Sequence, residues 1–153
     1  MQIRGSVSAP EIRNFLERQT IPLRLACRTP GGTLWMISLW FRCRDDDDEW
    51  ALQCSTAANA DVVSFLREDP AVAFEASTNE QPYRGVRGRG SVSIASDPEK
   101  AVLRDLLDRY LGGTDSSLAR NLLREGRDEV TITIDPVVVS GWDYSGRMTD
   151  SGD

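Results

Sequence analysis

The sequence predicts a mainly β protein of the α+β class, built as an antiparallel β-barrel with helices at its periphery. Its 153 residues suit a single domain, and 40% of them are hydrophobic, which is enough for a core. The expected elements run in the order helix, three strands, helix, two strands, two helices, two strands. This order lacks the sustained strand–helix alternation of a parallel sheet and therefore favours an antiparallel barrel. We expect one domain over residues 1–147 and a flexible tail over residues 148–153.

A helix and three strands are expected in the first third of the chain. Ser8 and Glu11 have the spacing of a capping box, and Pro10 falls in the first turn of the helix that follows. Alternating and β-branched residues then predict three strands, over residues 22–28, 33–44 and 49–54. We expect these strands to form an antiparallel meander. The four aspartates at residues 45–48 repel one another and should form a solvated loop.

Helices and strands are more mixed in the rest of the chain. Three helices are predicted there: one after residue 59 that ends at Asp69-Pro70, one from Asp97-Pro98 to Gly112-Gly113, and one near residues 116–124. The remaining strands are expected over residues 71–76, 85–94, 130–134 and 137–142.

Charge and composition argue against several classes of function. The net charge of −6 argues against a nucleic-acid partner, because phosphate backbones attract basic surfaces. No apolar run approaches the roughly 20 residues of a membrane-spanning helix, so we expect a cytoplasmic protein without a membrane partner. Three cysteines and no histidine make a zinc site or a Ser-His nucleophile pair hard to build, so no metal site is predicted. Any chemistry is therefore expected to come from a cofactor.

Four blocks of sequence carry a resemblance that spans about residues 20–147. They read PLRLACRTPGGTLWMISLWF, WALQCSTAANADVVSFLREDPAVAF, RGVRGRGSVSI and VVVSGWDYSGR. In their order and spacing they resemble the pyridoxamine 5′-phosphate oxidase-like, FMN-binding split β-barrel superfamily. The resemblance implies a homodimer with the flavin in a groove at the subunit interface and a small-molecule substrate. Family activities include oxidation of pyridoxamine phosphate, reduction with flavin or deazaflavin cofactors, haem handling and plain flavin binding.

A phosphate site is predicted where the third strand leads into the second helix. Ser55, Thr56 and Asn59 lie there, and amides at a helix N-terminus attract an anion that hydroxyl groups can also bind. The alternative is that Thr56 or Asn59 simply caps the helix. Arg24, on the first of the three strands, matches a basic position of the family and could bind phosphate in two-pronged fashion, or be an exposed edge arginine.

Further candidate residues lie on the second and later strands. By the resemblance, Ser38 and Trp40 would border the flavin ring, and Trp142 would approach the cofactor groove, although core packing is the alternative for each aromatic residue. Arg87 and Arg89 share one strand face and, with Arg84, should form a positive patch for an anionic cofactor tail or substrate. Pairing with the protein's own carboxylates is the alternative for this patch. No catalytic acid or base is predicted.

The first turn of the second helix departs from the family pattern. Tight FMN binders often carry Arg or Lys there, whereas this chain has Ala60 and Asp61, and a carboxylate repels phosphate. Three hypotheses follow: an FMN-dependent oxidoreductase, a non-enzymatic or cofactor-free dimer, and a deazaflavin-dependent reductase.

Overall fold

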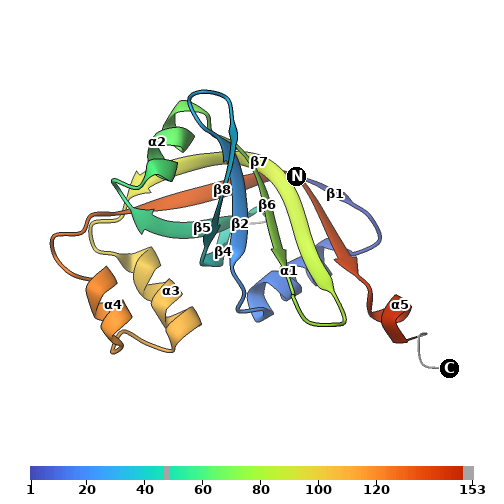
Figure 1. Ribbon diagram of the computed structural model, residues 1–153. Coiled ribbons are helices and arrows are strands. Elements are labelled where there is room, and N and C mark those ends of the chain that lie inside the picture. Colours follow the sequence, from blue (N-terminus) through green and yellow to red (C-terminus); the bar gives the residue numbers. More distant parts are fainter. Residues whose placement is uncertain (47–48, 150–153) are drawn as a thin grey trace.

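In the computed structural model, the chain forms one curled, mostly antiparallel sheet with helices around it (Figure 1). The structure describes residues 1–46 and 49–149. Its eight strands are β1 (Gln2–Arg4), β2 (Leu23–Arg28), β3 (Leu34–Leu39), β4 (Phe41–Asp46), β5 (Glu49–Ala57), β6 (Ala71–Ser77), β7 (Arg84–Ser96) and β8 (Glu129–Asp143). Its five helices are α1 (Ala9–Arg18), α2 (Asp61–Glu68), α3 (Ala101–Leu111), α4 (Ser117–Leu122) and α5 (Ser145–Thr149).

The strand order explains why the sheet is a barrel. The strands run in the order β3-β2-β6-β7-β8-β5-β4, and β1 adds a parallel pairing to β8. β3 and β4 follow each other in the chain with only Trp40 between them, yet they stand at the two ends of this order. The sheet must therefore curl back on itself, which confirms the predicted antiparallel split barrel with peripheral helices.

The inside of the curled sheet holds the main core. Leu23, Leu25 and Cys27 alternate along β2 and are buried, as period-2 burial of a strand requires. β5, β6 and β8 contribute buried residues in the same way, and α1 and α2 add Ile12 and Leu66. The core fixes which strand face points outward, and thereby positions the candidate site.

The expected helix boundaries are found where local capping chemistry sets them. The Ser8 side chain accepts from the Glu11 amide, and the Glu11 carboxylate accepts from the Ser8 amide at 2.8 Å, so the predicted capping box is present. α3 ends at Gly112, whose φ of 73° is the left-handed conformation that favours glycine. The start of α3 differs by three residues, because the Asp97 carboxylate accepts from the amides of Ala101 and Val102 across an intervening turn.

The prediction of one long strand over residues 33–44 within a meander is wrong. The strand is interrupted at Trp40, so that β3 pairs with β2 whereas β4 pairs with β5. The Trp40 ring stacks on Tyr110 of α3 with centroids 5.1 Å apart, and the Phe41 amide donates to the Tyr110 hydroxyl at 3.2 Å. A tertiary contact thus breaks a segment that contains no Gly or Pro.

Several other boundaries also differ from expectation. Residues 130–134 and 137–142 belong to one strand, β8, with a register shift between Arg89 and Gly90 of β7 that accommodates Pro136. β4 continues through Asp45 and Asp46, which pair with Trp50 and Glu49, so the expected loop starts too early. Residues 47–48 lie outside the described part.

Both ends of the chain contain elements that the sequence did not predict. β1 pairs with β8 near the N-terminus, and α5 includes residues 148 and 149 of the segment expected to be a tail. Residues 150–153 lie outside the described part.

Candidate functional site

The outer face of β3, β2, β6, β7 and β8 carries two rows of residues in register. The first row runs across the strands as Ser38, Arg24, Glu75, Arg87 and Ser140. The second row runs as Met36, Ala26, Ala73, Arg89 and Val138. Residues two apart along a strand share a face, so the two rows lie side by side. This face is therefore built from five segments that are distant in the sequence.

A groove of about 400 Å³ follows these rows. We call it the outer groove; its lining is Arg24, Ala26, Met36, Ala73, Phe74, Glu75, Arg87, Gly88, Arg89, Val138 and Ser140. Its floor includes alanines and a glycine, which leave the backbone accessible, and its rim includes three arginines. Such a surface suits a flat, largely apolar group that carries negative charge.

The arginines of the outer groove are available to a ligand. Arg24 and Arg89 form no ion pair or side-chain hydrogen bond with any residue in the ranges 1–46 and 49–149. Glu75, the register partner of Arg24 in the first row, accepts from the Ser77 hydroxyl at 2.7 Å. The Arg87 guanidinium lies over the Trp142 ring, 5.2 Å from its centroid. Three cations around one carboxylate leave the groove with a net positive charge.

Trp142 lies flat against the backbone of the neighbouring strand. Gly85 is its register partner on β7, and a Cβ at Gly85 would lie only 2.4 Å from the indole ring. Glycine is therefore required at this position for the ring to approach the sheet. The packed indole also holds Arg87 at the edge of the groove.

The structure brings together half of the predicted site residues. Arg24, Ser38 and Arg87 lie in the first row of the outer face, and Trp142 lies on the same face, two residues along β8 from Ser140 of that row. Ser38 is exposed, and Trp142 contacts Arg87. Their roles toward a cofactor stay predictions, but their proximity is a feature of the fold.

Ser55 and Thr56 do not lie where the sequence placed them. β5 continues to Ala57, so both residues are inside a strand and pair with Thr131 and Val130 of β8. The Ser55 hydroxyl donates to the carboxylate of Glu129 at 3.0 Å, and this carboxylate, which is 3% exposed, also forms an ion pair with Arg127. A phosphate at Ser55 would thus meet a buried negative charge.

Asn59 is exposed in the turn before α2. The N-cap of α2 is Ala60, and among the described residues no side-chain capping hydrogen bond is formed there. The alternative prediction, that Thr56 or Asn59 caps this helix, is therefore wrong. β5 extends to Ala57, further than the sequence indicated, so α2 starts too far along the chain for Thr56 or Asn59 to be its N-cap.

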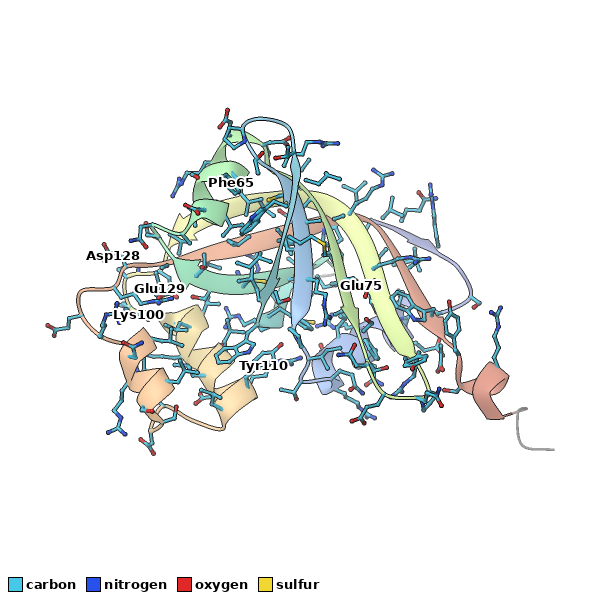
Figure 2. The ribbon with its side chains drawn as sticks, viewed as in Figure 1. Phe65, Glu75, Lys100, Tyr110, Asp128 and Glu129 are labelled. Atoms are coloured by element: carbon cyan, nitrogen blue, oxygen red, sulfur yellow. The ribbon has the colours of Figure 1, made fainter. Side chains whose placement is uncertain are left out.

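Trp40 and Arg84 lie apart from the outer groove. Trp40 stacks on Tyr110 and packs against a small cluster with Leu103 and Leu107, which is the core-packing alternative. In Figure 2, Tyr110 lies on α3, below the sheet. Arg84 lies over the Phe15 ring of α1, so the predicted patch of three arginines on β7 is wrong in this member. Arg24 of β2 lines the groove with Arg87 and Arg89 instead.

Sequence reasoning missed the groove residues that depend on register. Glu75 and Ser140 share the row of Arg24 and Arg87, and Ala73 forms part of the floor. No motif marks them. Only the pairing of β2 with β6 and of β7 with β8 brings them to the site.

Three further kinds of feature find no support in the described part of the chain. Among residues 1–46 and 49–149, no cluster of three or more His, Cys, Asp or Glu residues could hold a metal ion. Within the same ranges, no helix has the length and apolar character needed to cross a bilayer. The cysteine thiols are poor nucleophiles, because burial raises the pKa of Cys43 to about 11 and that of Cys54 to about 12.

Comparisons with solved structures identify the fold. A conserved hypothetical protein from Mycobacterium tuberculosis superposes with a TM-score of 0.74 at 22% identity, over 94% of this chain and 91% of that one. A protein named F420 reductase superposes with a TM-score of 0.66 at 28% identity, over 84% of this chain and 94% of that one. A FAD-binding protein from Mesorhizobium loti gives a TM-score of 0.62 at 21% identity, over 88% of this chain and 93% of that one.

The neighbours define the fold of the chain. The chain has the split β-barrel fold of the pyridoxamine 5′-phosphate oxidase-like proteins, as the sequence resemblance implied. Two of the three structures described above carry names that refer to a flavin-type cofactor. No family model matches the sequence, and a search of curated proteins also gives no match.

Proposed function

We propose that the protein binds a flavin-type cofactor in the outer groove, the deazaflavin coenzyme in preference to FMN, and acts as an oxidoreductase on a small molecule. The observation that carries this proposal is the set of three arginines around a flat apolar floor, of which Arg24 and Arg89 have no side-chain partner in the described part of the chain. Unpaired cations on an acidic protein are expected where an anionic ligand binds.

The residues of the outer groove fit such a cofactor. Ala26, Ala73 and Gly88 leave room for a planar ring to lie against the sheet, and Met36 can cover its edge. Arg24, Arg87 and Arg89 would hold negatively charged groups, and Trp142 would keep Arg87 in place. When bound, the cofactor supplies the redox step, while the protein orients it and excludes water.

Two observations favour the deazaflavin coenzyme over FMN. The phosphate site predicted from Ser55, Thr56 and Asn59 is compromised by the buried Glu129 carboxylate and by Asp61 in the first turn of α2. The structure named F420 reductase has the higher identity of the two neighbours with cofactor names, 28% against 21%. The acidic tail of a deazaflavin coenzyme would suit the arginines of the outer groove.

A homodimer is part of this proposal. Leu34, Met36 and Val137 are 79%, 62% and 52% exposed on or beside the outer face. Apolar side chains gathered on one face favour a second copy of the chain as partner, with the cofactor between the two. Met36→Glu should then give monomers in sedimentation, and Leu118→Glu, at an exposed leucine of α4, should leave the dimer intact.

Cofactor titration tests the proposal directly. The purified protein is titrated with the deazaflavin coenzyme, FMN and FAD, and binding is followed by fluorescence. Arg24→Glu and Arg87→Glu should each weaken binding by roughly tenfold to a hundredfold, because each variant removes a charge-assisted contact. The matched control is Arg120→Glu, which makes the same charge change on the exposed side of α4.

The outcomes separate the hypotheses. Binding of the deazaflavin coenzyme ahead of FMN, sensitive to Arg24 and Arg87 but not to Arg120, supports the proposal. A colourless dimer that binds none of the three cofactors would support a cofactor-free protein instead. Equal losses in all three variants would mean that only the overall charge matters and would remove the assigned site.

A further inference from the structure

A second pocket lies beside the outer groove, where the hairpin between β6 and β7 approaches the end of α1. Its volume is about 360 Å³. We call it the hairpin pocket; its lining is Gln19, Ile21, Pro22, Arg24, Ser77, Thr78, Asn79, Glu80, Gln81, Pro82 and Arg84. Polar and charged side chains make up most of this lining, in contrast to the apolar floor of the outer groove. The pocket is therefore suited to a polar ligand or to the polar part of a larger one.

Arg84 packs over the Phe15 ring of α1, but the hydrogen bonding of its guanidinium is incomplete. Its Nε atom is buried and has no hydrogen-bond partner among residues 1–46 and 49–149. Its backbone is fixed by Thr78, whose hydroxyl accepts from the Arg84 amide at 3.1 Å and whose amide donates to the Arg84 carbonyl at 2.9 Å. A buried donor without a partner is costly, so it is expected where a ligand completes the bonding.

The carboxylates near Arg84 do not supply that partner. Asp143 is its register partner on β8, but the Asp143 carboxylate accepts from the amide and hydroxyl of Ser145. No ion pair joins Arg84 to an acidic residue of the described part. Within the pocket, Arg24 and Arg84 face a single acidic residue, Glu80, which leaves a net positive charge.

Arg24 connects the two pockets, because its side chain lines both of them. A ligand whose ring lies in the outer groove can therefore extend past Arg24 into the hairpin pocket. Two arginines, whose planar forks match the oxygen atoms of phosphate, would then lie at the end of that ligand.

We infer that the hairpin pocket binds a phosphate group, with Arg84 and Arg24 as its ligands and the Thr78–Gln81 hairpin as its wall. This inference rests on the proposed function where the phosphate belongs to the cofactor in the outer groove. A free phosphate ion or a separate phosphorylated molecule offers the same chemistry, and the experiment distinguishes these sources.

The test compares ligands that differ only in the phosphate-bearing part. Wild type, Arg84→Gln and Arg18→Gln are titrated with FMN and riboflavin, with the deazaflavin coenzyme and its phosphate-free deazariboflavin, and with inorganic phosphate by calorimetry. Arg18 is a matched control because it lies on the other side of Arg84, in a pocket that Arg84 also lines, and is not part of the hairpin pocket. Arg84→Lys, which keeps the charge, and thermal melting of each variant check that the fold is intact.

We expect Arg84→Gln to weaken binding of the phosphate-bearing cofactor by roughly tenfold and binding of the phosphate-free form by less than twofold. The affinity of Arg84→Lys for the phosphate-bearing cofactor should lie between those of wild type and Arg84→Gln, and the affinity of Arg18→Gln should equal that of wild type. Equal effects on both forms, or no effect on either, overturn the inference. If wild type binds none of the cofactors, the proposed function fails. The titration with inorganic phosphate then tests by itself whether the hairpin pocket binds phosphate. Phosphate binding that Arg84→Gln abolishes then supports a free phosphate as the source, and absence of phosphate binding overturns the inference as well.

Discussion

The outer side of the curled sheet consists of a part that α3 covers and a part that is exposed. The two parts differ in whether their polar side chains have hydrogen-bond or ion-pair partners. Beneath α3, Arg42 donates to Gln53, and Gln53 donates to Thr133 of β8 at 3.2 Å. Arg42 also forms an ion pair with Asp105 of α3. On the exposed part, by contrast, Arg24 and Arg89 have no side-chain partner within residues 1–46 and 49–149.

The contrast separates structural from functional charge. Figure 2 shows Glu129 at the covered end of the sheet and Glu75 on the strands of the exposed part. The former is buried and bonded to Ser55 and Arg127. Buried charges must be paired to be tolerated, so the covered charges maintain the fold. Charges that remain unpaired on a solvated face cost little, and they are available for a ligand.

The largest expected effect comes from an arginine of the covered part. Arg109 of α3 donates to the carbonyls of Leu16, Glu17 and Gln19 at the end of α1, at 2.7, 3.0 and 2.8 Å. Arg109→Ala removes all three bonds, and we expect it to lower the free energy of unfolding by about 3 kcal/mol in urea denaturation. The Nε atoms of Arg84 and Arg109 are both buried without a hydrogen-bond partner in the described part of the chain. Arg84 donates no bonds like the three of Arg109 within that part, so Arg84→Ala should cost less than about 1 kcal/mol. Equal losses of unfolding free energy in Arg109→Ala and Arg84→Ala would contradict the distinction between the covered and the exposed part.

The sequence predicted what local interactions determine. The Ser8–Glu11 capping box, the glycine at the end of α3 and the alternation along β2 depend on residues a few positions apart, and the structure confirms them. The candidate site depends on distant pairing. Arg24 meets Glu75 only through the register of β2 with β6, and Ser55 meets Glu129, which is 74 positions away. No spacing in the sequence encodes these contacts.

Alkaline pH offers a second way to sharpen the comparison, with a smaller effect per pH unit. Burial raises the pKa of Cys54, on β5, from 9.0 to about 12. Between pH 9 and 12 the unfolded chain loses this thiol proton while the folded chain keeps it. The free energy of unfolding should therefore fall as pH rises, by at most about 1.4 kcal/mol per pH unit for this thiol.

Cysteine variants isolate this contribution. Cys54→Ala should flatten the decline of the unfolding free energy over the whole interval from pH 9 to about 12. Cys43→Ala should flatten it only up to about pH 11, where burial places the pKa of that thiol. Urea denaturation at a series of pH values measures both slopes. A Cys54→Ala slope identical to that of wild type would show that the main core inside the curled sheet admits solvent at Cys54.

The smallest expected effect on stability tests the exposed part. Arg89 lies on the outer face two residues along β7 from Arg87, without an ion pair in the described part of the chain. Arg89→Gln removes a charge from a positive cluster, so the free energy of unfolding should change by no more than about 0.5 kcal/mol. Cofactor affinity should nevertheless fall, and the salt dependence of binding should become shallower, because one fewer cation attracts the ligand. A stability loss comparable to that of Arg109→Ala would instead mean that the cation is held for the fold, and that the unpaired arginines do not mark a binding site.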